Sequence, residues 1–62
     1  MLLLAPQTER LVLLLLAFYG PADAEAVLER AAEIARHRGI PMVTPYHVML
    51  AFNELCLRGI VY

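Results

Sequence analysis

The longest apolar run in this chain, Leu11 to Tyr19, contains no charged side chain. Its leucines favour a helix over a strand, although periodicity alone leaves a run of this length ambiguous. A helix that is apolar on every side is normally buried on every side. The rest of the 62-residue chain supplies two other short helices, which cannot surround it. The run therefore predicts that part of this helix contacts a partner surface.

Glycine and proline residues divide the chain into three predicted helices, because proline favours the first helical turn and glycine the position after the last. The boundaries are Gly20-Pro21, Gly39-Ile40-Pro41 and Thr44-Pro45. The predicted helices cover residues 7–19, 22–38 and 45–58. Thr44 is the expected N-cap of the third helix. We expect one all-α domain over residues 1–62, in which three short helices form a small orthogonal or histone-like bundle.

The second and third predicted helices each have an apolar face at helical spacing. On helix 22–38 this face consists of Ala24, Val27, Leu28, Ala31, Ile34 and Ala35. On helix 45–58 the inner stripe consists of Val48, Ala51, Phe52 and Leu55. The coherent polar strip of that helix is limited to His47, Glu54 and Arg58. The tail at 60–62 is apolar again, and we expect it to cover the core or to contact a partner.

The composition also predicts association. Apolar residues make up 61% of the chain, against about 45–50% in ordinary soluble domains. A core of this size needs a staple such as a disulfide, a metal or oligomerisation. Cys56 is the only cysteine, and no cysteine and histidine cluster has zinc spacing. We expect a homo-oligomer, or a complex with a larger protein. The expected interface is formed by apolar side chains of the first and third helices: Leu13, Leu14, Leu16, Phe18, Met49, Leu50 and Leu57.

The sequence does not predict an enzyme, catalytic residues, a cofactor or a metal site. It contains no glycine-rich phosphate loop and no nucleophile with a neighbouring base. We interpret His37 as a surface residue at a helix C-terminus, and His47 as either solvent-facing or hydrogen-bonded locally. Cys56 lies between leucines and is expected to be buried and inert. The glutamates that recur every four residues are expected to form a solvated face; they are Glu25, Glu29 and Glu33.

The candidate anion-contacting residues are Arg30, Arg36 and Arg38. The formal net charge is −1, so the chain lacks the basic field that nucleic-acid binding requires.

The longest apolar run is about half of the ~20 residues that a membrane-spanning helix needs. The first residues lack the basic region of a signal peptide, and the lone thiol fits a reducing compartment. We therefore expect a cytoplasmic protein; association with a membrane surface is an alternative that we do not favour.

The stretch from Ala32 to Ala51 resembles a small helical domain found at the C-terminus of one component of light-independent protochlorophyllide reductase. The residues that carry the resemblance are Ala35-Arg36-His37-Arg38-Gly39-Ile40, Val43-Thr44, Val48 and Ala51. The resemblance implies a helix, an Arg-Gly-Ile turn, a threonine cap and a second helix. The cluster ligands and acids of that family lie in other domains, so no catalytic role carries over to this chain.

Two further families are similar in part. Residues 44–51 resemble a helix start in the N-terminal repeats of Clp-type chaperones, although Tyr46 stands where that family has an acid. Those domains carry two repeats, which this chain is too short to contain. The order of helices with a threonine-capped last helix is similar to a histone fold, and implies a histone-like dimer.

Together these features predict a non-catalytic helical protein–protein interaction module that assembles through apolar helix faces as a homo-oligomer. Two alternatives stay open. One is a small accessory subunit of a larger enzyme or photosynthetic complex, and the other is a histone-like nucleic-acid binder.

Overall fold

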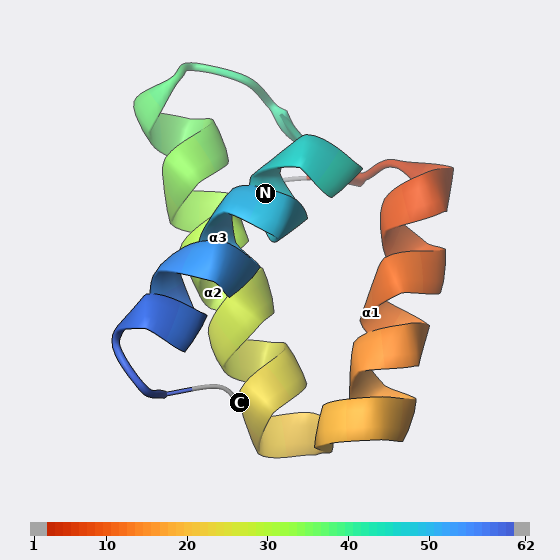
Figure 1. The fold of residues 1–62 in the computed structure, drawn as a ribbon. Helices are drawn as coiled ribbons and strands as arrows, with labels where there is room; N and C mark the ends of the chain where they lie inside the picture. Colours follow the sequence, from red (N-terminus) through yellow and green to blue (C-terminus); the bar gives the residue numbers. More distant parts are fainter. Residues whose placement is uncertain (1–2, 61–62) are drawn as a thin grey trace.

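The computed structural model describes residues 3–60, and the predictions for residues 1–2 and 61–62 lie outside this range. The elements in chain order are β1 (Leu3–Leu4), α1 (Pro6–Tyr19), α2 (Pro21–His37), β2 (Met42–Val43) and α3 (Pro45–Leu57). Figure 1 shows α1 and α2 joined as a hairpin, with α3 crossing α2. The predicted fold of three helices is confirmed.

Each helix begins at a proline, one residue earlier than predicted for the first two helices. Proline fits the first helical position because the amide hydrogen that it lacks would be unpaired there. A single residue, Gly20, separates α1 from α2 and has a φ of 90°. The second and third helices end one residue earlier than predicted, because Arg38 and Arg58 are C-caps.

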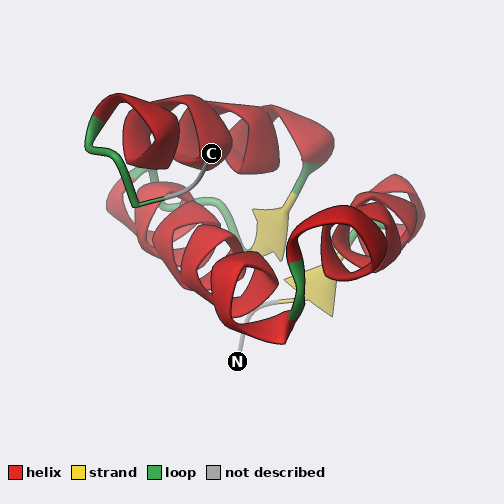
Figure 2. Cartoon of the chain, turned by 60° about the horizontal axis from the view of Figure 1, so that its bottom comes forward, coloured by secondary structure: helices red, strands yellow, loops and turns green. Residues whose placement is uncertain are grey.

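The two short strands form a parallel pair that the sequence did not predict. Leu3 lies opposite Met42 and Leu4 opposite Val43. The amide of Ala5 extends the pairing, donating a 3.1 Å hydrogen bond to the Val43 carbonyl. Figure 2 shows the strands side by side where they lead into α1 and α3. The pair thus fixes the start of α1 against the segment that enters α3.

The core lies mainly between α2 and α3. Small and β-branched side chains dominate it, which lets the two helices approach closely. The buried cluster consists of Val27, Ala31, Ala35, Val43, Val48, Ala51 and Leu55. These residues include most of the two predicted inner faces, while Leu28, Ile34 and Phe52 are only partly buried. The tail is described as far as Ile60, which is half exposed, and the prediction for the rest of the tail lies outside the described residues.

Candidate interaction surface

Helix α1 buries very little of itself. Of its fourteen residues, the only one that is buried is Thr8. Leu11 and Leu15 are partly buried and pack against the core on the inner side. Leu13 is 64% exposed on the outer side, and Phe18, in the last turn of the helix, is 79% exposed. The expectation that two short helices cannot enclose this one is confirmed for the described residues.

The exposed positions of α1 follow from how the helix lies on the other two. Thr8, Leu11 and Leu15 are three or four residues apart, so they point to one side. Five further residues of α1 are exposed: Arg10, Leu13, Leu14, Ala17 and Phe18. Leu13, Ala17 and Arg10 lie on the opposite side, and Leu14 and Phe18 continue the row from Arg10 toward the flank of the helix, where Phe18 follows Leu11 by seven residues. We call these five residues the outer stripe of α1.

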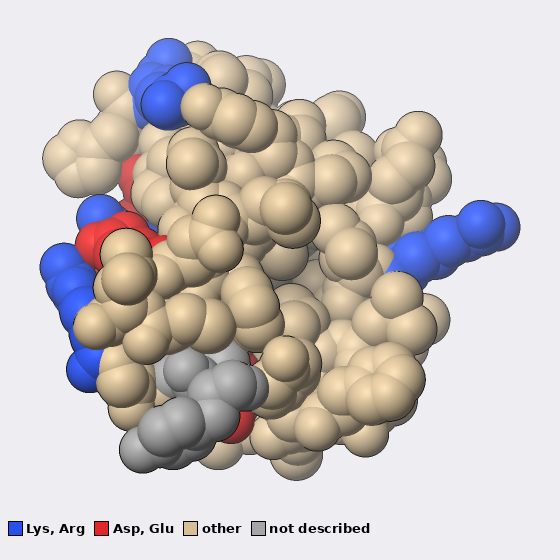
Figure 3. Space-filling view, in the orientation of Figure 1, with Lys and Arg blue, Asp and Glu red and all other residues tan. Residues whose placement is uncertain are grey.

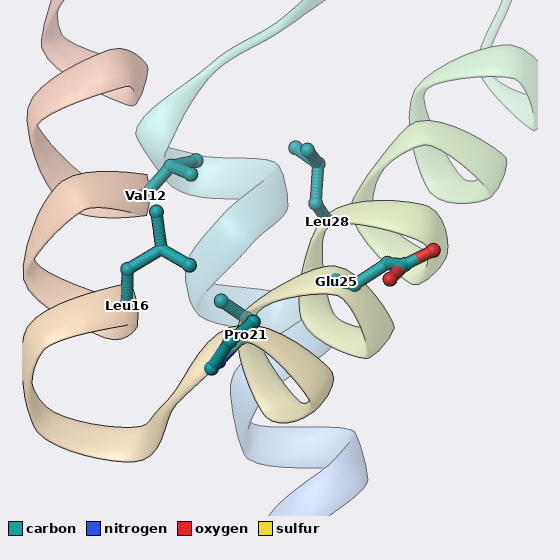
Figure 4. A pocket seen from close by; sticks show the side chains of 6 residues that line it. Val12, Leu16, Pro21, Glu25 and Leu28 are labelled. Carbon is teal, nitrogen blue, oxygen red and sulfur yellow. The ribbon is translucent and has the colours of Figure 1, made fainter.

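A hollow between α1 and α2 exposes further apolar surface. Its volume is about 270 Å³, and its lining is Val12, Leu16, Pro21, Ala24, Glu25 and Leu28. Figure 4 shows the side chains of Val12 and Leu16 on α1 facing the α2 residues across it, with α3 behind both helices. Leu16, which the sequence assigned to an interface, therefore opens into this hollow and does not belong to the outer stripe.

The predicted interface residues on α3 are also accessible to a partner. Met49 is 58% exposed and Leu57 is 90% exposed, whereas Leu50 is half-buried. Tyr46 is a further exposed aromatic residue on this helix. Figure 3 shows that the face formed by α3 and α1 carries few charges: acidic and basic side chains gather at its left edge, and further basic side chains lie at the top and project at the right.

An ion-pair network joins α2 to α3 and accounts for part of that charged edge. Arg30 Nε lies 2.8 Å from Glu54 Oε2, and Arg30 also binds Glu33 at 2.9 Å. Arg58 binds the other oxygen of Glu54 at 2.9 Å. The hydrogen bond from Arg30 holds the pKa of the Glu54 carboxyl below its ordinary value. The two carboxylates, Glu54 foremost, raise the pKa of Arg30.

The three candidate anion-contacting arginines, Arg30, Arg36 and Arg38, have different surroundings. Two carboxylates already pair with Arg30. The guanidinium carbon of Arg38 lies 5.3 Å from the centre of the Tyr46 ring, a cation–π distance. Arg36 borders a shallow surface hollow together with Glu33 and His37.

The interpretation of His47 as solvent-facing is wrong, and its alternative, a local hydrogen bond, is confirmed. The side chain is 2% exposed. The backbone amide of Thr44 donates a 3.0 Å hydrogen bond to its Nδ1. His47 thus takes the place of the glutamate or glutamine in a capping box. Because Nδ1 accepts, the proton of the neutral ring is on Nε2, which is buried without a partner in the described part of the chain.

The remaining candidates agree largely with their predicted surface or core roles. His37 is exposed, as are Glu25, Glu29 and Glu33. Cys56 is only half-buried, because it lies beside the inner stripe of α3 and not within it. No group of three or more metal-binding side chains exists within residues 3–60.

Comparisons of the chain with protein-family models, curated proteins and solved structures found no match. Within residues 3–60, no helix has the length and apolar character needed to cross a membrane.

Proposed function

We propose that this chain is a non-catalytic interaction module that assembles with copies of itself through apolar helix faces. The observation that carries the proposal is the exposure of α1, in which Leu13, Leu14 and Phe18 are each more than half exposed. Monomeric soluble proteins seldom leave large contiguous apolar patches in water, and such patches mark interaction sites. Another molecule that covers this surface would remove it from water. Each Å² of apolar surface removed would stabilise the assembly by about 25 cal/mol.

A second copy is a suitable partner because most soluble oligomers are symmetric and use one patch on both subunits. A standard interface takes about 800 Å² from each partner. The chain exposes 4288 Å², so such an interface would cover roughly a fifth of it. The charged residues between α2 and α3 pair with one another, so they do not require a partner molecule to satisfy their charges.

The experiment compares the wild-type chain with a double variant, Leu14→Glu with Leu16→Glu. Both leucines are exposed in the single chain, at 53% and 41%. The substitutions should therefore preserve the helices. An interface over the outer stripe would have to bury the new charge at position 14, and one that also covers the hollow would have to bury the charge at position 16. Light scattering should give an oligomer for the wild type and a monomer for the variant, and circular dichroism should give the same helicity for both.

The control variant is Ala22→Glu with His37→Glu, which adds the same charge at two exposed positions of α2. It should keep the wild-type mass. A double leucine variant that also keeps the wild-type mass would overturn the assignment of the interface to α1. A wild-type chain that is monomeric, or that requires another protein to stay in solution, would overturn self-association and favour an accessory subunit.

A further inference from the structure

Three residues of the outer stripe are evenly spaced along one side of α1. Arg10, Leu14 and Phe18 are four residues apart, which places them on neighbouring turns. With a rise of 1.5 Å per residue, Arg10 and Phe18 each lie about 6 Å along the helix axis from Leu14, in opposite directions. Arg10 is exposed and takes part in no ion pair within residues 3–60. Phe18 is 79% exposed. The stripe thus has a cation at one end and an aromatic ring at the other.

We propose that α1 pairs in an antiparallel orientation with α1 of a second copy, with the two-fold axis beside Leu14. This inference rests on the proposed function and adds the geometry of the interface. A two-fold axis at that position brings Arg10 of each copy to the level of Phe18 of the other. Arginine over an aromatic face is a favourable cation–π pair, and it becomes stronger when water is excluded.

The single charge of the outer stripe, Arg10, favours an antiparallel direction for a pair of copies. A parallel pair would place Arg10 beside the same residue of the other copy, and like charges repel. An antiparallel pair separates the two arginines and gives each an aromatic partner. Glu9, the other charged residue of α1, is about 140° away from Leu14 around the helix and stays outside the proposed contact. Residues 11–19 carry no charge, so this part of the helix offers no ion-pair partner to a charged surface on another protein.

The side chains between the ends of the stripe suit a close helix pair. Leu13 and Leu14 are both exposed and lie next to the proposed axis. Ala17 is also exposed, and its small side chain permits an interaxial distance within the usual 8–10 Å. The leucines of one copy would pack beside Ala17 of the other, and the resulting contact repeats itself across the axis as a two-fold interface requires.

Cysteine cross-linking tests this geometry in the full chain with Cys56→Ala as background. Under mild oxidation by copper phenanthroline, Leu14→Cys should form a disulfide-linked dimer. Arg10→Cys alone and Phe18→Cys alone should not. An equal mixture of Arg10→Cys and Phe18→Cys should form the mixed dimer, because an antiparallel pair brings these two positions together.

The opposite pattern would overturn the proposal. In a parallel pair, the Arg10→Cys and Phe18→Cys variants would each link to themselves and their mixture would give no mixed dimer. If none of the cysteine variants links while the wild type is an oligomer, the interface lies elsewhere and the antiparallel pair is wrong, although self-association stands. A monomeric wild type would overturn both.

A second comparison needs no cysteine. Leu14→Glu should lower the mass of the assembly to that of one chain. Leu57→Glu makes the same change at the most exposed leucine of α3, 90% exposed, and should leave the mass unchanged. Dissociation by Leu57→Glu and not by Leu14→Glu would assign the interface to α3 and contradict the proposal.

Discussion

The hydroxyl of Thr8, in the first turn of α1, donates a 2.7 Å hydrogen bond to the backbone carbonyl of Val43. Both residues are almost completely buried. The same carbonyl accepts the amide of Ala5 at 3.1 Å, so it uses both of its lone pairs. These bonds fasten the start of α1 to the strand that leads into α3. The opposite end of α1 continues into α2 through Gly20.

Replacement of Thr8 by valine should lower the free energy of unfolding by about 1 kcal/mol. Valine has nearly the shape of threonine but removes the hydroxyl donor. The Val43 carbonyl would keep its bond from Ala5, so the larger cost of an unpaired buried acceptor should not arise. Urea unfolding measures the difference. Thr8→Ser keeps the donor and is the control; if serine and valine destabilise equally, packing rather than the hydrogen bond holds α1 in place.

At His47, the chemistry of the N-cap predicts an order of stability among variants. Glutamine can accept the Thr44 amide hydrogen as it does in other capping boxes, whereas leucine cannot. We expect His47→Gln to be more stable than His47→Leu by roughly 0.5–2 kcal/mol, the usual value of a cap. Thermal and urea unfolding of the two variants check this order. A leucine variant at least as stable as the glutamine variant would mean that burial outweighs the cap at this position.

The network around Glu54 predicts how stability changes with pH. Because Arg30 lowers the pKa of Glu54 in the folded chain, the contribution of Glu54 is fully present above its unfolded pKa, near the ordinary 4.5. It is lost as the pH falls through the lower, folded pKa. Unfolding midpoints from pH 6 down to about 3 should therefore fall more for the wild type than for Glu54→Gln. Equal slopes for the two chains would contradict the role of this carboxylate.

Local signals in the sequence predicted the helices well. Pro21 and Pro45 stand at helix starts, and Gly20, Gly39 and Gly59 all have positive φ at or just beyond helix ends. These signals require only neighbouring residues, and the errors were of one residue, at the proline starts of α1 and α2 and at the C-terminal ends of α2 and α3. The apolar run likewise predicted a helix that the chain does not enclose, because two other short helices are too few to cover every side of it.

Contacts between distant segments could not be predicted in the same way. The strand pair joins Leu3–Leu4 to Met42–Val43, and two-residue apolar segments have no periodicity that would identify a partner so far along the chain. His47 was assigned to a polar strip because histidine is usually at least partly exposed. Its place three residues after Thr44 is the position of the second capping-box residue, which is the signal that could have indicated burial.

The assembly state of the unmodified chain tests the central claim most directly. Light scattering at a series of concentrations, without detergent, should give twice the chain mass of 7.0 kDa at high concentration. The mass should fall toward that of one chain on dilution, with unchanged helicity by circular dichroism. A chain that has the mass of one copy at every concentration, while fully helical and soluble, would show that the exposed face of α1 needs no second copy and would contradict the account.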